Sequence, residues 1–163
     1  MAAVDLEHAI QTVMTGTTPR LEAGDNAGAS HGMHASVLVV ESDSGERLHT
    51  AKVLEAAGYR VQAASSFAEA KHVLATSPVR VLLTGVRLGA YNGLHLIVRS
   101  RVEHPDMVAI LTNHLLDPVL KAEAERQGAL YFPRPWTDQA LLEVVAHLLE
   151  HDTGSSASQK ASN

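Results

Sequence analysis

The sequence predicts an α/β fold in which five parallel strands alternate with helices, and three observations support this. Short apolar runs of strand length recur between segments with helical spacing. Ser, Asp, Gly and Pro stand at the boundaries, where helices begin and end. Several runs are apolar at nearly every position, as in parallel strands covered by helices on both faces. Alternation of this kind implies right-handed crossovers between neighbouring parallel strands.

The first two strands and the helix between them begin this pattern. Residues 36–41, SVLVVE, form a continuous apolar run. The segment 47–58 has helical spacing, with Leu48 expected on its buried side and Gly58 at its end. Residues 59–64 then alternate in polarity, which predicts a half-buried strand.

The next elements are marked by their starting residues. Ser65 or Ser66 is expected to cap a helix over residues 67–75, and Pro78 precedes the third strand, 79–85. Asp117 before Pro118 is a strong helix start, and Thr137 is expected to cap the last helix. The remaining elements are predicted as helix 92–104, strand 107–112, helix 119–127, strand 129–133 and helix 138–151.

The predicted domain covers residues 36–151, with a segment on either side. Residues 1–35 read as a flexible segment of linker composition, within which 4–14 allow a short amphipathic helix. One face of that helix would carry Leu6, Ile10 and Val13. Residues 152–163 are small and polar, which predicts a disordered tail.

Composition excludes several classes of function. The net charge is -5, and the 13 basic residues are scattered, which argues against a nucleic-acid partner. No apolar run approaches the roughly 18 residues of a membrane span. The chain has no cysteine, so disulfides, thiol nucleophiles and cysteine-bound zinc are excluded, and a cytoplasmic location is the expected one.

Ligands of such a sheet gather beyond the carboxyl ends of its strands, where the strand order reverses. The residues at these ends are therefore the candidate site. They are Glu41, Ser42 and Asp43 after the first strand, Gly85 after the third, Thr112 after the fourth and Arg134 after the fifth.

Taken together, these strand ends resemble the receiver domain of two-component response regulators, over about residues 35–151. The family pattern VLVVDDD is matched by VLVVESD, its lysine motif KPF by RPW at 134–136, and its Thr or Ser by Thr112. Its acceptor Asp stands eight residues before a Gly; counting back from Gly93 reaches Gly85. The resemblance implies a flavodoxin-like (βα)5 fold with strand order 2-1-3-4-5.

The departures from the family pattern concern its chemistry. Receivers accept a phosphoryl group on an aspartate, whereas Gly85 offers no nucleophile, and the neighbouring Thr84 should point to the other face. Glu41 keeps one charge of the acidic pair, Ser42 removes the other, and Asp43 is displaced and could instead cap the following helix. We therefore predict no cofactor and weak or absent Mg²⁺ binding.

Two features of the predicted pocket have alternative interpretations. Arg134, in place of lysine, could form an ion pair with Glu41 across the pocket or could point to solvent. By the resemblance, Thr112 and the aromatic Tyr131 would be the moving parts of the receiver switch. They could equally be an ordinary strand residue and a half-buried aromatic.

Other residues were weighed as binding groups. The last helix region has a wide apolar arc that is either core packing or a surface for a protein partner. In the second case the chain could also form a homodimer through it. The residues of this surface would be Trp136, Leu141, Val145 and Leu148. Two histidine pairs have spacings that a metal could use: His31 with His34, and His147 with His151. Neither pair has a third ligand nearby in the sequence, so no metal site is predicted.

These inferences favour a single-domain pseudo-receiver that acts without phosphorylation. It would be a signalling module rather than an enzyme, because no nucleophile–base pair stands at the strand ends. Its partner would be a histidine kinase or another signalling protein, and only a polar tail follows the last helix. The alternative is a small-ligand or anion sensor that uses Arg134 and Thr112 in the vacated pocket.

Overall fold

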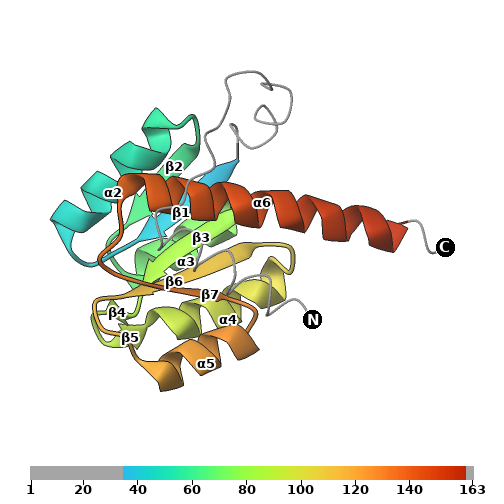
Figure 1. Cartoon of the computed structure of the whole chain (residues 1–163). Coiled ribbons are helices and arrows are strands. Elements are labelled where there is room, and N and C mark those ends of the chain that lie inside the picture. The colour runs from blue at the N-terminus through green and yellow to red at the C-terminus, as the bar shows by residue number, and fades with distance from the viewer. Residues whose placement is uncertain (1–34, 161–163) are drawn as a thin grey trace.

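The computed structural model describes residues 35–160 of the chain, with side chains up to residue 151. Its centre is a five-stranded parallel sheet in the order β2-β1-β3-β6-β7 (Figure 1). Counted along the chain, this is the predicted order 2-1-3-4-5, so the predicted fold class is confirmed. The strands are β1 (Ser36–Val40), β2 (Arg60–Ala64), β3 (Val81–Gly85), β6 (Val108–Asn113) and β7 (Leu130–Pro133).

Helices cover both faces of this sheet. They are α2 (Ser44–Ala56), α3 (Phe67–Thr76), α4 (Gly93–Glu103), α5 (Pro118–Arg126) and α6 (Asp138–Lys160). Helices α2 and α6 pack on one face, and α3, α4 and α5 pack on the other (Figure 1). Each helix therefore buries its apolar side against the strands, which is the arrangement that right-handed crossovers produce.

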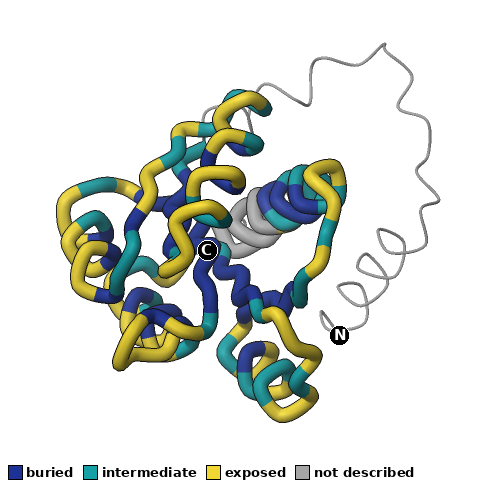
Figure 2. The backbone as a smooth tube through the Cα atoms, turned by 90° about the vertical axis from the view of Figure 1, so that its left-hand side faces the viewer, coloured by how far each residue is buried: buried dark blue, intermediate teal, exposed yellow. Residues whose placement is uncertain are grey.

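The core consists of two apolar layers, one on each side of the sheet. Strand β1 shows how they are separated: Val37 and Val39 pack under α2 and α6, whereas Leu38 and Val40 pack under the other helices. All four side chains are at most 2% exposed. Figure 2 shows this buried sheet surrounded by helices whose outer sides are exposed. The nearly continuous apolar runs in the sequence follow from burial on both faces.

The capping residues occupy the positions that the sequence predicts. Ser66 begins α3 by accepting a hydrogen bond from the Glu69 amide at 3.2 Å. Asp117 begins α5 by accepting bonds from two first-turn amides, both at 3.0 Å. Thr137 accepts a bond from the Ala140 amide at 3.1 Å at the start of α6. These contacts satisfy amide groups that have no partner inside the helix.

A short hairpin between β3 and α4 was not predicted. Its strands, β4 (Arg87–Leu88) and β5 (Tyr91–Asn92), are two residues each and pair antiparallel. Gly89 in the turn has φ +64°, a left-handed conformation that glycine adopts without steric cost. Strands this short carry no periodicity, so the turn residues are their only signal in the sequence.

The apolar arc of the last helix is core and not a surface. Leu141 and Val145 are 1% and 0% exposed, and Leu148 packs against the same layer. The prediction of a partner surface is therefore wrong for Leu141 and Val145: α6 lies on the sheet and against α2, so this side of the helix is buried. Trp136, just before the helix, is half-buried and stacks on Phe132 with ring centroids 4.7 Å apart. Leu48, expected in the core, is 56% exposed.

The predicted C-terminal end of the domain differs from the structure, and the predicted N-terminal segment lies outside the described residues. Helix α6 continues to Lys160, past the end at residue 151 that the sequence predicts, and its last turns extend beyond the sheet (Figure 1). Propagating a formed helix is easier than starting one, so a weak helical sequence can follow a strong one. Residues 1–34, including the predicted helix 4–14, and residues 161–163 lie outside the described residues. Within the described part, no helix has the length and apolar character needed to cross a membrane.

The start of α4 lies unusually close to the end of β3. A Cβ built on Gly93 would overlap the Gly85 carbonyl oxygen and would lie 2.9 Å from Thr84 Oγ1. The Gly93 amide donates to the Val86 carbonyl at 2.8 Å, which fixes this approach. Only glycine fits at position 93 without moving backbone.

We therefore expect Gly93→Ala to lower the free energy of unfolding by about 1–3 kcal/mol, the usual cost of overpacking. Chemical denaturation measures this. Gly45→Ala is the matched control, because Gly45 also lies in a first helical turn and its added Cβ would meet only Asp43 Oδ1, at 3.3 Å. The control should stay within about 1 kcal/mol of wild type. Equal stability of the two variants would contradict the close approach.

The start of α3 also makes stability depend on pH. Glu69 Oε2 accepts the Ser65 amide at 2.7 Å and the Ser65 hydroxyl at 3.0 Å, and these bonds lower the pKa of the Glu69 carboxyl from its ordinary value. A carboxyl group whose pKa is lower in the folded state stabilises the protein at pH values above its unfolded-state pKa. This stabilisation is lost as the pH falls through the folded-state pKa.

Glu69→Gln should therefore reduce the loss of stability on acidification, most clearly below the ordinary pKa of a glutamate. Thermal unfolding measured between neutral and acidic pH tests this, with Glu103→Gln, at an exposed position of α4, as the control. An unchanged pH profile in Glu69→Gln, or the same change in the control, would contradict it.

Candidate functional site

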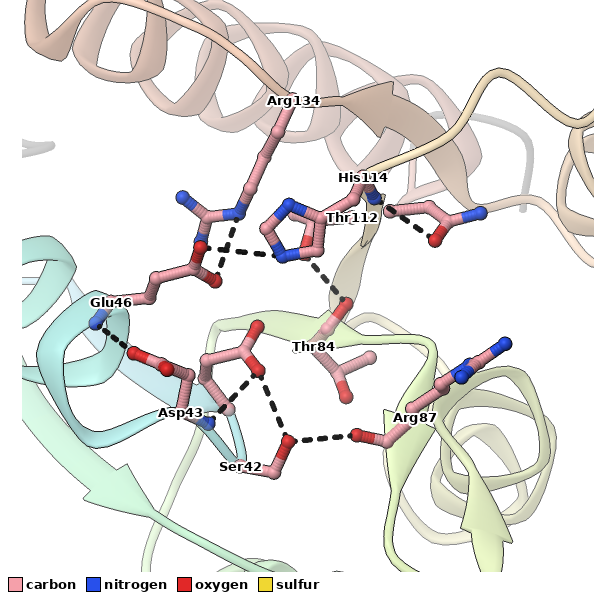
Figure 3. A network of polar contacts seen from close by, with 10 residues as sticks. Ser42, Asp43, Glu46, Thr84, Arg87, Thr112, His114 and Arg134 are labelled. Carbon is pink, nitrogen blue, oxygen red and sulfur yellow. Dashed lines mark hydrogen bonds and ion pairs between the residues drawn. The ribbon is translucent and has the colours of Figure 1, made fainter.

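The predicted site residues meet at the carboxyl edge of the sheet. Glu41 follows β1, Gly85 ends β3, Thr112 lies in β6 and Arg134 follows β7. The register pairs Gly85 with Thr112 across β3 and β6. Figure 3 shows the polar contacts at this edge, to which α2 and the β4–β5 hairpin also contribute.

The Glu41 carboxylate lies directly over Gly85. A Cβ built on Gly85 would be 2.7 Å from Glu41 Oε2 and 3.3 Å from Glu41 Cδ. The other oxygen, Oε1, accepts hydrogen bonds from the Asp43 amide at 3.3 Å and the Ser42 hydroxyl at 3.4 Å. The space that a side chain at position 85 would enter is thus occupied by a carboxylate from the first strand end.

Ser42 and Asp43 have structural partners of their own. The Ser42 hydroxyl is within 3.2 Å of the Arg87 carbonyl oxygen, which links the first loop to the hairpin (Figure 3). Asp43 Oδ1 accepts a hydrogen bond from the Glu46 amide at 2.8 Å. Asp43 therefore caps α2, which is the alternative to a place in the acidic pocket. Glu41 is therefore the one carboxylate of this loop that faces Gly85.

These residues do not fit a Mg²⁺ site. Mg²⁺ requires near-octahedral oxygen ligation, usually anchored by carboxylates. Here one carboxylate faces Gly85, the Ser42 oxygen is neutral, and the Asp43 carboxylate serves as a helix cap. No group of three or more acidic or histidine side chains suited to a metal occurs in the described part of the chain.

Arg134 does not pair with Glu41, so that predicted ion pair is wrong. Its Nε lies 3.5 Å from Oε2 of Glu46, one turn into α2, and its guanidinium stacks over Trp136 at 4.0 Å from the ring centroid. Figure 3 shows Arg134 directed to this glutamate. The helix brings Glu46 nearer to β7 than Glu41 can reach, because Glu41 turns inward over Gly85. The alternative of a solvent-directed arginine is also excluded, since the side chain is only 17% exposed.

Glu46 also contacts a residue beyond β6. Its Oε1 lies 3.3 Å from His114 Nε2. Glu46, His114 and Arg134 line an open pocket of ≈ 260 Å³ together with Pro135 and Trp136. This pocket lies beside the predicted site, with the Arg134 cation already paired to a carboxylate.

The Thr112 hydroxyl contacts the backbone of the neighbouring strand and not the Glu46–Arg134 pair. Thr112 is 3% exposed, and its hydroxyl is 3.5 Å from the Thr84 carbonyl oxygen of the neighbouring strand. The Thr84 hydroxyl in turn donates to the Gly85 carbonyl at 3.0 Å, away from the Glu41 carboxylate, as alternation along a strand predicts. Thr112 and Arg134 thus contact different groups.

Tyr131 is fully buried rather than half-buried. It is 1% exposed, and its hydroxyl donates to the Leu115 carbonyl at 2.6 Å. The same oxygen accepts the Asp117 amide and the Asn113 side-chain amide, both at 3.2 Å. The aromatic residue of β7 therefore fixes the loop between β6 and α5.

The histidine pairs do not form a metal site in the described residues. His147 and His151 lie together on α6 with ring centroids 4.2 Å apart, but no third ligand accompanies them. His31 and His34 lie outside the described residues.

Sequence reasoning did not identify Glu46, His114 or the Arg87 carbonyl as parts of this edge. Glu46 lies within a helix, and its position one turn after the Asp43 cap is the signal that could have placed it there. Arg87 lies in the two-residue strand β4 and His114 in the loop after β6, and both segments are too short or irregular to show periodicity in the sequence.

Comparison with known proteins finds relatives of this chain by sequence. No family model matches the chain. It is 28% identical over 116 residues to the DNA-binding transcriptional regulator NtrC of Escherichia coli K12, a match that covers 71% of this chain and 25% of the relative. The regulator NtrC of Salmonella typhimurium matches to the same extent. The chain thus spans about a quarter of the length of these relatives.

Solved structures share the fold over most of the described residues. A CheY-like response regulator receiver domain from Methanospirillum hungatei has a TM-score of 0.72 and 21% identity, covering 75% of this chain and 98% of that one. The signal receiver domain of an HD domain-containing protein from Pseudomonas fluorescens has a TM-score of 0.69 and 26% identity, covering 74% and 98%. The described domain therefore has the fold of the CheY-like receiver domains of response regulators.

Proposed function

We propose that this chain contains a receiver domain of two-component type that works without accepting a phosphoryl group at position 85. The observation that carries the proposal is the Glu41 carboxylate over Gly85, with Oε2 2.7 Å from where a Cβ would lie. A glycine here removes the nucleophile, and the carboxylate fills the space it would need. The pocket is adapted to the absence of the acceptor.

Electrostatics supports the same conclusion. A phosphoryl group carries negative charge, and its transfer normally requires cations to neutralise that charge. Here the group facing Gly85 is an anion, and the nearby Arg134 cation pairs with Glu46 and stacks on Trp136. An incoming phosphoryl group would therefore meet a carboxylate rather than a cation.

We infer that the domain acts through contact with a protein partner and not as an enzyme. The Ser42 hydroxyl lies 3.4 Å from Glu41 Oε1, and the Arg87 carbonyl at 3.2 Å competes for its proton. This pair lacks the short, directed hydrogen bond of an activated nucleophile. A histidine kinase or another signalling protein is the class of partner that the fold favours.

The alternative of an anion sensor has less support from the contacts. It requires the Arg134 guanidinium and the Thr112 hydroxyl to face one ligand. Each is directed to a different group, Glu46 for Arg134 and the Thr84 carbonyl for Thr112. A ligand would have to break the ion pair before it could bind.

Phosphorylation can be tested with acetyl phosphate and Mg²⁺, followed by intact mass measurement. We expect no phosphoryl adduct on the wild-type chain. The triple variant Glu41→Asp/Ser42→Asp/Gly85→Asp restores the acidic pair and the acceptor of the family pattern and should gain an adduct. The double variant Glu41→Asp/Ser42→Asp, which keeps Gly85, is the matched control and should gain none.

An adduct on the wild-type chain that survives in a Ser42→Ala variant would contradict the proposal. An adduct lost in that variant would place the chemistry on Ser42 and would equally overturn a domain that acts by contact alone.

Magnesium binding provides a separate test. Because a single carboxylate faces Gly85, titration of the wild-type chain with Mg²⁺ should not saturate at millimolar concentration. The backbone amide signals of residues 41–43 and 85 report this by NMR. The triple variant should saturate at millimolar Mg²⁺. Saturation of the wild-type signals at these residues would contradict the expectation.

A further inference from the structure

An apolar patch is exposed between β6 and α5. Leu115, Leu116 and Val119 are 71%, 73% and 78% exposed, and Pro118 between them is also exposed. We call these four residues the loop patch. Other large exposed apolar side chains of the described residues, such as Leu48 on α2, are not clustered in this way along the chain. Clustered exposure of this kind marks a contact surface.

The loop patch is held in place by buried groups. The Tyr131 hydroxyl donates to the Leu115 carbonyl at 2.6 Å and accepts the Asp117 amide at 3.2 Å. Asp117 in turn caps α5 through two amides at 3.0 Å. The backbone on both sides of Leu116 is therefore anchored to the core. A surface fixed in this way loses little conformational entropy when it is covered.

We propose that residues 4–14 of the same chain bind the loop patch. Leu6, Ile10 and Val13 recur at the spacing of one helical face, and residues on that face need an apolar surface. A helix this short is marginal by itself in water, so contact with a surface would stabilise it. The loop patch offers three large apolar side chains for the three on the segment.

The length of the chain allows this contact. The described domain begins at Ala35, just before β1, at the opposite end of the sheet from the loop patch. Along β1 and across two strand spacings to β6, the separation is about 20 Å. The roughly 20 residues between the segment and the domain, with a Gly-rich linker composition, have a root-mean-square span of about 25 Å. Segment and patch therefore lie within reach of one another.

This contact would regulate access to the loop patch. A protein partner that binds the patch must first displace residues 4–14, so the segment would act as an intramolecular competitor. The inference does not depend on the loss of the acceptor at position 85, because none of the loop patch residues contacts Glu41 or Gly85.

Paramagnetic relaxation in the full chain tests the contact. The chain has no cysteine, so His8→Cys provides a single attachment point for a spin label. In the proposed helix His8 would lie opposite Leu6, Ile10 and Val13, where a label leaves the apolar face free. We expect the methyl signals of Leu115, Leu116 and Val119 to lose most of their intensity, and those of Leu54, buried under α2 on the other face of the sheet, to lose little.

Three variants and one mixed sample decide the origin of this effect. Ile10→Asp in the spin-labelled chain should restore the methyl signals, and Leu116→Ser should restore those of Leu115 and Val119. Leu48→Ser, at an exposed leucine on α2, should leave the effect unchanged. When spin-labelled chain is mixed with isotope-labelled chain that carries no label, the signals should remain.

Signals that stay intact in the first labelled chain, or that remain weak in Ile10→Asp, would overturn the proposal. Signal loss in the mixed sample would also overturn it, because the occupant of the loop patch would then be a second copy of the chain.

Discussion

The feature on which the candidate site depends is the contact between the Glu41 carboxylate and the backbone of Gly85. A carboxylate can lie this close to a strand end only where no Cβ is present, and Gly85 meets that condition. The contact also determines its surroundings: with Glu41 turned inward, the Arg134 guanidinium has Glu46 as its acidic partner, and Asp43 serves as the cap of α2. The absence of one side chain thus makes room for a carboxylate at the centre of the site.

The fold was predictable because its signals are local and repeated. The buried strands β1 and β3 are apolar on both faces, and Ser66, Asp117 and Thr137 each begin a helix through a hydrogen bond that the residue type dictates. The arc of α6 was ambiguous for a physical reason. Amphipathic spacing shows that Leu141 and Val145 share an apolar side, but only the width of the sheet and the position of α2 decide that this whole side is buried.

The site was predictable at its backbone positions and less so in its contacts. Strand ends of a parallel sheet meet at one edge, which brings residues 41, 85, 112 and 134 together. Which charge pairs with which depends on side-chain length and on the helix rise. Glu46 and Glu41 differ by little in sequence position, yet α2 places the former toward Arg134 and the first loop places the latter over Gly85. Such choices arise between elements and leave no pattern in the sequence.

Thr112 and Tyr131 have neutral partners in this domain. Thr112 lies against the Thr84 carbonyl, and the Tyr131 hydroxyl makes three hydrogen bonds, all to groups between Asn113 and Asp117. None of these bonds involves a charged group at the Glu41–Gly85 contact. Buried hydrogen bonds are costly to break without replacement, so the loop between β6 and α5 keeps its position without a charge in the pocket to attract it. A domain built in this way can present a fixed surface at that loop.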